Sequence, residues 1–137
     1  MREILFRGKR KTDGIWLHGD LRQWSETRKG ICDYSLRGTS EVHPETVGQF
    51  TGLTDKDGNK IFDGDVVCYT TPDDSRAFGI VRFGEYGSGG SCHVGFGVDW
   101  FGRHDTGWLR CDIGFWVKFR EIKVIGNIHD NPELLEG

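Results

Sequence analysis

The chain has 137 residues, a formal net charge of −3 and 21 glycines beside 17 aromatic residues and only three prolines. This length suits one domain with a modest core that needs no disulfide to hold it, and the acidic balance gives no global attraction to nucleic acid. Abundant glycine and aromatic residues exclude a disordered linker and indicate a β protein rich in turns.

The cysteines and the first residues indicate where the protein acts. Cys32, Cys68, Cys92 and Cys111 are widely spaced, without a Cys-x-x-Cys pair, so neither a disulfide framework nor a zinc site is expected. No apolar stretch near the start is long enough to span a membrane or direct export. We therefore expect a cytoplasmic protein with reduced thiols, no metal, no other cofactor and no membrane contact.

The first 41 residues predict one clear hairpin and one irregular stretch. Residues 2–8 and 15–21 alternate apolar and polar positions as strands do, and the turn signal Thr12-Asp13-Gly14 lies between them. Residues 23–41 are polar and show little periodicity. There we expect mobile or variable structure, with at most a short strand at residues 34–36.

The central stretch, residues 42–69, predicts a second hairpin. Residues 47–53 are rich in strand formers, residues 55–60 hold Asp-Gly and Asn as turn residues, and an apolar pattern resumes at residues 61–69. A calcium-binding loop starting at Asp55 would need a Gly at its sixth position and a Glu at its twelfth. Lys60 and Val66 stand there instead, so the stretch is better interpreted as a plain turn.

The second half of the chain also predicts strands. Residues 78–83, 93–100 and 121–128 alternate, and residues 109–119 are rich in apolar residues, with no stripe long enough for a core helix. In the clearest of these strands one face consists of Val94, Phe96, Val98 and Trp100, and in residues 109–119 Phe115, Val117 and Phe119 lie opposite Trp116 and Lys118. Asn131 as N-cap and Pro132 after it predict one helical turn at the end.

These elements favour a single, mainly β domain over residues 1–137. Residues 1–60 form a region of β-hairpins, and residues 61–131 form a small SH3-like barrel that precedes the short helical turn.

No catalytic constellation is visible, so the sequence favours a binding protein. Surplus rings on the outer faces of strands often mark protein interfaces; the candidates are Trp16, Trp24, Trp108 and Trp116. One alternative is a module for single-stranded nucleic acid that uses the rings and basic groups of Trp100, Arg103, His104, Trp108 and Arg110. The other is a metal-dependent hydrolase that uses Asp55, Asp57, Asp63 and Asp65.

Two long motifs carry a family resemblance. VHPETVGQFTGLTDKDGNKIFDGDVV at residues 42–67 and VIGNIHDNPELL at residues 124–135, with the openings REILFRG and WLHGDL, resemble the YopX family. The resemblance covers essentially the whole chain and is loosest over residues 72–115. Proteins of this family are small, mostly β and encoded by bacteriophages and prophages, without an established activity.

The resemblance implies no catalytic residue. It implies a protein encoded by a phage or prophage in a bacterial cell. With the cytoplasmic location and the surplus rings described above, we expect host or phage proteins as partners, and self-association as a further use of the rings. Several positions of the shared motifs are interpreted as structural, at turns and bulges: Pro44, Glu45, Gly48, Gln49, Gly52, Gly64, Asp65, Gly126 and Asn127.

Overall fold

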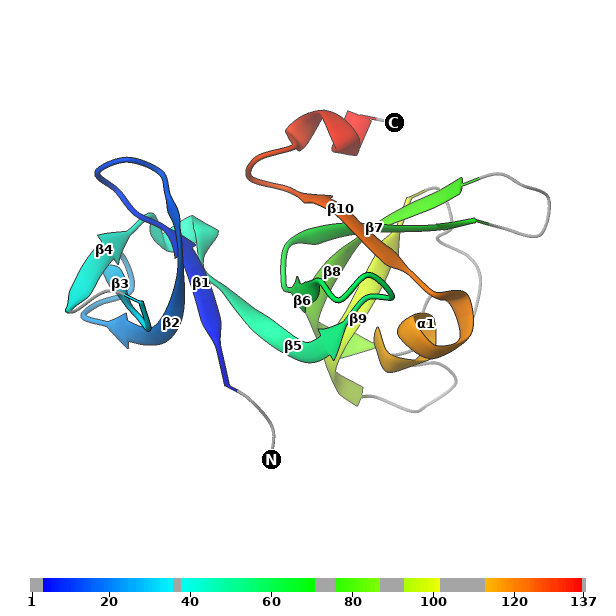
Figure 1. The fold of residues 1–137 in the computed structure, drawn as a ribbon, viewed down its shortest axis with the longest axis horizontal. Helices are drawn as coiled ribbons and strands as arrows, with labels where there is room; N and C mark the ends of the chain where they lie inside the picture. Colours follow the sequence, from blue (N-terminus) through cyan, green and yellow to red (C-terminus); the bar gives the residue numbers. More distant parts are fainter. Residues whose placement is uncertain (1–3, 36–37, 71–75, 87–92, 102–112, 137) are drawn as a thin grey trace. The chain divides into compact units, whose positions relative to one another are not determined.

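The computed structural model describes residues 4–35, 38–70, 76–86, 93–101 and 113–136. The chain forms two compact units, Met1–Gly52 and Leu53–Gly137. Both are built mainly from antiparallel strands (Figure 1), which confirms the predicted fold class. In the described residues no helix is both long and apolar enough to cross a membrane.

The first unit is an antiparallel sheet in which the chain folds back at each turn. Its strands belong to a six-stranded sheet of order β4-β3-β2-β1-β5-β6. In that sheet β5 continues across the boundary between the units, and β6 (Lys60–Phe62) belongs to the second unit. The elements are β1 (Phe6–Lys9), β2 (Trp16–Gln23), β3 (Lys29–Asp33), β4 (Thr39–Val42), the 3-10 turn η1 (Pro44–Thr46) and β5 (Gly48–Thr54).

This first sheet curls until β4 reaches the chain at the end of β1. The Lys11 amide donates to the Glu41 carbonyl (3.0 Å), and the His43 amide donates to the Lys9 carbonyl (2.8 Å). Inside the curl, the apolar face of the sheet forms the core of the unit. Its members are Leu17, Ile31 and Val42, with Phe6, Leu21 and Val47 packed against them.

The second unit is a four-stranded antiparallel sheet in the order β10-β7-β8-β9. Its described strands do not close into a barrel, so the predicted SH3-like barrel is not confirmed. The elements after β5 are β6 (Lys60–Phe62), β7 (Asp65–Thr70), β8 (Arg76–Tyr86), β9 (His93–Trp100), the helix α1 (Ile113–Arg120), β10 (Lys123–Asn127) and the 3-10 turn η3 (Pro132–Glu136). The last of these confirms the predicted helical turn.

Aromatic rings form the centre of the second core. The Trp100 ring meets the Tyr69 ring edge to face with centroids 5.1 Å apart, and it meets the Trp116 ring at 5.0 Å. Val98 and Phe96 lie on the same face of β9 and are buried as well, as the alternation of that strand predicted. Such ring pairs stabilise a core beyond the area that they bury.

The prediction for residues 109–119 was wrong over residues 113–119, and residues 109–112 lie outside the described residues. Residues 113–120 form the helix α1 instead of a strand, and Trp116 is fully buried in the core rather than exposed at an interface. A short apolar run fits a strand or a buried helix equally well, because periodicity alone cannot separate them. Packing decides here: Ile113 and Trp116 lie three residues apart, on one helical face, and both enter the core.

The irregular structure expected over residues 23–41 was also wrong, and residues 36 and 37 of this stretch lie outside the described residues. Two strands, β3 and β4, lie in this stretch, whereas Tyr34 and Ser35, expected in a short strand, belong to the turn after β3. The Ser35 amide and hydroxyl both donate to the Asp33 carboxylate, at 2.8 and 2.6 Å. These strands are short and carry polar residues on their outer face, so their alternation is hard to see in the sequence.

Candidate functional site

The structure does not support the nucleic-acid surface predicted around Trp100. Trp100 is only 2% exposed and belongs to the second core, so its ring cannot stack on a base at the surface. The other four predicted residues, Arg103, His104, Trp108 and Arg110, lie outside the described residues.

The four aspartates of the hydrolase alternative do not gather around one position. In the described part of the chain, no group of three or more histidine, cysteine or acidic side chains could hold a metal ion. The buried Asp65 carboxylate accepts a hydrogen bond from the Phe62 amide at 2.7 Å, and Asp57 lies 3.5 Å from the Lys123 ammonium group.

Asp55 holds its own turn together and joins it to β10. One carboxylate oxygen accepts from the amides of Asp57 and Asn59 at 3.0 and 2.9 Å, and the other accepts from the Val124 amide at 3.0 Å. Burial would raise the pKa of Asp55, but these donors outweigh burial and leave that pKa below its usual value. The position is that of a structural carboxylate.

The positions interpreted as structural motif lie at turns, pairings and bulges. Gly52 and Gly64 have positive φ angles of 91° and 94°, and the register of β10 against β7 shifts between Val124 and Gly126. The Asn127 side-chain oxygen accepts from the His129 and Asp130 amides, both at 2.9 Å. Pro44 and Glu45 begin η1, and Gly48 and Gln49 pair with β1.

Of the four tryptophans predicted at an interface, Trp24 is the one that the structure exposes. It is 51% exposed at the end of β2, whereas Trp16 is partly buried, with the Arg7 guanidinium 4.8 Å and the Lys9 ammonium 5.5 Å from its ring centroid. Trp116 is in the core, and Trp108 lies outside the described residues. Trp24 is therefore the centre of the candidate site.

The turn between β2 and β3 brings Arg28 onto the Trp24 ring. The amides of Trp24 and Ser25 both donate to the Arg28 carbonyl, at 3.0 and 3.2 Å, and the Ser25 hydroxyl oxygen accepts from the Thr27 amide at 3.2 Å. This tight turn leaves the Arg28 guanidinium 5.3 Å from the centroid of the ring, within the range of a cation–π contact.

A glycine on β3 makes room for the same ring. A Cβ atom on Gly30 would lie 2.8 Å from Cη2 of Trp24 and 2.8 Å from Cγ2 of Thr39, which is closer than real Cβ contacts. The ring therefore rests against the backbone of β3, where any side chain at position 30 would push it away. Gly30 and Arg28 together hold an exposed tryptophan in a fixed place.

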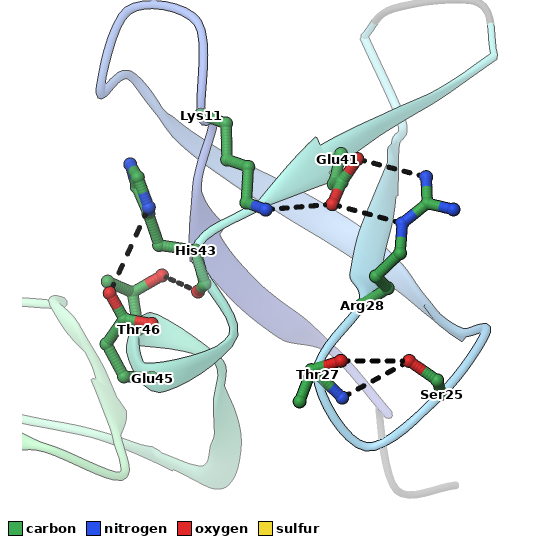
Figure 2. A network of polar contacts seen from close by, with 8 residues as sticks. All are labelled: Lys11, Ser25, Thr27, Arg28, Glu41, His43, Glu45 and Thr46. Carbon is green, nitrogen blue, oxygen red and sulfur yellow. Dashed lines mark hydrogen bonds and ion pairs between the residues drawn. The ribbon is translucent and has the colours of Figure 1, made fainter.

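Glu41 on β4 links this turn to the chain that follows β1 (Figure 2). Arg28 Nη2 donates to Glu41 Oε1 at 3.1 Å, and Lys11 Nζ donates to Glu41 Oε2 at 2.9 Å. The hydrogen bonds from Arg28 and Lys11 lower the pKa of Glu41 to about 2, so this carboxylate is charged at any physiological pH. We call Lys11, Trp24, Arg28, Gly30 and Glu41 the Trp24 patch.

Sequence reasoning found Trp24 but missed the rest of the patch. Arg28 could have been found from its place four residues after Trp24, across a tight turn. Lys11 and Glu41 are 30 residues apart, and they meet only because β4 returns to the end of β1. No local signal in the sequence reveals that return.

Comparison with known proteins places the chain in a family. A sequence model of the family described as "YopX protein" matches residues 5–136. The chain belongs to the YopX family. This confirms the resemblance seen in the motifs, and no curated protein matches the chain significantly.

A solved structure shares the fold of this YopX protein. It is described as "Crystal structure of protein EF1440 from Enterococcus faecalis", and it is 21% identical to this chain with a TM-score of 0.51. The match covers 98% of this chain and 99% of the other. At this identity the likeness concerns the fold alone.

The structural role of Asp55 can be tested by truncation. Asp55→Ala should lower the free energy of unfolding by about 1–3 kcal/mol, because the Val124 and Asn59 amides lose their acceptor. Urea denaturation measures the change. Asp57→Ala is the matched control on the exposed side of the turn and should change stability by less than about 0.5 kcal/mol. Equal losses would contradict the assignment.

The lowered pKa of Asp55 also predicts how stability depends on pH. Because this pKa is lower in the folded chain than in the unfolded chain, the ionised carboxylate stabilises the fold at every pH above the unfolded value of about 3.9. That contribution is lost as the pH falls through the folded pKa. The stability difference between the wild type and Asp55→Asn should stay constant from about pH 7 to pH 5 and shrink below about pH 4. A difference that grows towards acid pH would show the opposite sign.

The place of Trp24 against Gly30 can be tested with one methyl group. Gly30→Ala should displace the ring, which changes the chemical shift of the Trp24 indole N–H and removes the ring-current shift of the Arg28 side chain in NMR spectra. Adding Thr39→Ser removes one of the two other atoms that the new Cβ would meet and leaves the Ser40 carbonyl oxygen at 3.0 Å, so the double variant should recover part of the wild-type shifts. Unchanged spectra of Gly30→Ala would show that the glycine has no part in placing the ring.

Proposed function

We propose that this YopX protein is a non-enzymatic binding module and that it contacts a protein partner through the Trp24 patch. The observation that carries the proposal is the half-exposed Trp24 ring, which is held by the Gly30 backbone and the Arg28 guanidinium. A ring that is fixed before binding loses little conformational freedom when a partner covers it.

The composition of the patch supports a protein partner. Tryptophan and arginine are enriched among the few residues that dominate the binding energy of protein interfaces, and here they stack on each other. The Arg28 side chain is 61% exposed and the Lys11 side chain is 42% exposed, so both can donate further hydrogen bonds to a partner. The patch therefore offers an apolar centre with a polar rim, as protein interfaces do.

Under this proposal the protein acts as an adaptor in the cytoplasm of a bacterial cell that carries a phage or prophage. Its partner is a host or phage protein, and self-association is a further use of the same surface. Membership of the YopX family supports this setting. No observation on the described residues favours the nucleic-acid or hydrolase alternatives.

The proposal can be tested by comparing variants against one identified partner. The full chain would be used to capture proteins from phage-infected bacterial lysate, and a captured protein would be purified and titrated by calorimetry. Trp24→Ala should raise its Kd by at least about 30-fold, which is the effect of a hot-spot residue. The variant must keep the wild-type urea midpoint.

Phe119→Ala is the matched control, because Phe119 is an exposed aromatic residue of the second unit, 58% exposed. It should change the Kd by less than about threefold. A captured partner that binds Trp24→Ala as tightly as the wild type would place the interface elsewhere.

A further inference from the structure

We propose that the partner segment that binds the Trp24 patch is acidic, and that Glu41 takes the place of its carboxylate in the free protein. The inference rests on the proposed function, because it names the chemistry of the partner at the same patch. It begins from an unequal number of charges: the single carboxylate of Glu41 accepts hydrogen bonds from two cations that come from different turns of the first unit (Figure 2).

The two cations are more open than the carboxylate that they share. The side chain of Glu41 is 28% exposed, against 42% for Lys11 and 61% for Arg28. Glu41 occupies one donor of Lys11 and two of Arg28, although an ammonium group has three donors and a guanidinium has five. The remaining donors can therefore make a first contact with an incoming acid before it displaces Glu41 from one of the two cations.

A third cation lies in the same cross-strand row. Arg22 on β2 is opposite Gly30, and Gly30 is opposite Glu41, so the three residues lie on one face of the sheet. Arg22 is exposed. The first unit as a whole also has more basic than acidic residues. Residues 1–52 hold nine Lys and Arg against seven Asp and Glu, whereas the whole chain holds 18 against 21.

Exchange of one carboxylate for another at this site requires little free energy. Ion pairs between exposed side chains contribute only weakly to stability, since water and salt screen them. An incoming carboxylate can thus take over Lys11 or Arg28 while Glu41 keeps the other, and Trp24 contacts an apolar side chain beside it. Glu41 keeps the cations in place until the partner arrives, and it competes with the partner once it has bound.

A protein acid fits these groups better than a nucleic acid. Single-stranded nucleic acids bind along positively charged grooves, with bases stacked on open aromatic faces. Here Arg28 lies over one face of the Trp24 ring and closes that face to a base. The patch suits one or two carboxylates rather than a row of phosphates.

The test follows NMR signals of the full chain during titration with defined probes. The acidic probe is a ten-residue peptide of Glu, Leu and Ser, the basic probe has Lys in place of Glu, and the third probe is a ten-nucleotide oligothymidine. The acidic peptide should shift the Trp24 indole and Gly30 amide signals, and Glu41→Gln should bind it about two- to fivefold more tightly than the wild type, because the competing charge is gone.

Asp57→Asn is the matched control, since it removes one negative charge from an exposed ion pair with Lys123 in the second unit. It should leave the Kd of the acidic peptide unchanged. Weaker or equal binding by Glu41→Gln would overturn the inference and leave Glu41 a purely structural role. Larger shifts of the same signals with oligothymidine would assign the patch to nucleic acid instead.

The captured partner separates this inference from the proposed function. If Trp24→Ala abolishes partner binding while Glu41→Gln does not tighten it, the patch is the interface and the acidic chemistry is wrong. If the partner binds Trp24→Ala normally, the proposed function fails, whatever the peptides do.

Discussion

Two backbone hydrogen bonds hold β4 against the chain at the end of β1, from Lys11 to Glu41 and from His43 to Lys9. They turn a meander of short strands into a curled sheet with an inside and an outside. The inside takes up the few large apolar residues of the first unit, among them Leu17, Ile31 and Val42. A small unit needs such an enclosed face, because a flat sheet of this size would leave its core residues in water.

The same contact determines what the outer face presents. Lys11 and Glu41 are distant in sequence and become neighbours through the return of β4, and Glu41 then reaches Arg28 in the turn between β2 and β3. The meeting of Lys11 and Arg28 at Glu41 is therefore a consequence of the curl. The Lys11–Glu41–Arg28 part of the Trp24 patch and the core of the first unit thus depend on one feature of the backbone.

Strands with regular alternation could be predicted from the sequence, and the elements decided by tertiary packing could not. The face of β9 with Phe96, Val98 and Trp100 was visible as a period of two. The hairpin turns were visible from their Asp and Gly residues. Trp116 was misplaced because its short stretch of apolar and polar residues has no unique period. Its place in the core is visible only from its contacts with Tyr69 and Trp100. Sequence patterns report local geometry, whereas packing combines distant segments.

The site shows the same limit from the functional side. Trp24 could be recognised as a surplus ring. Gly30, which lies against that ring, and Glu41, which binds Arg28, are ordinary residues until the register of β3 and β4 is known. The register also explains why Gly30 lies against the Trp24 ring. Gly30 is paired with Glu41, so both positions are on the outer face of the sheet.

The Trp24 patch is not required by the fold of the first unit. Trp24, Arg28 and Lys11 are absent from its core, and the turn that carries Trp24 and Arg28 is closed by backbone hydrogen bonds and by Ser25. A polar residue at position 24 would suit the fold equally well, because it would not expose the apolar surface of an indole to water. The chain instead keeps a large ring at the surface, leaves a glycine beneath it and places a guanidinium over it. Because the core of the first unit does not require this arrangement, it supports the proposal that the patch contacts another molecule.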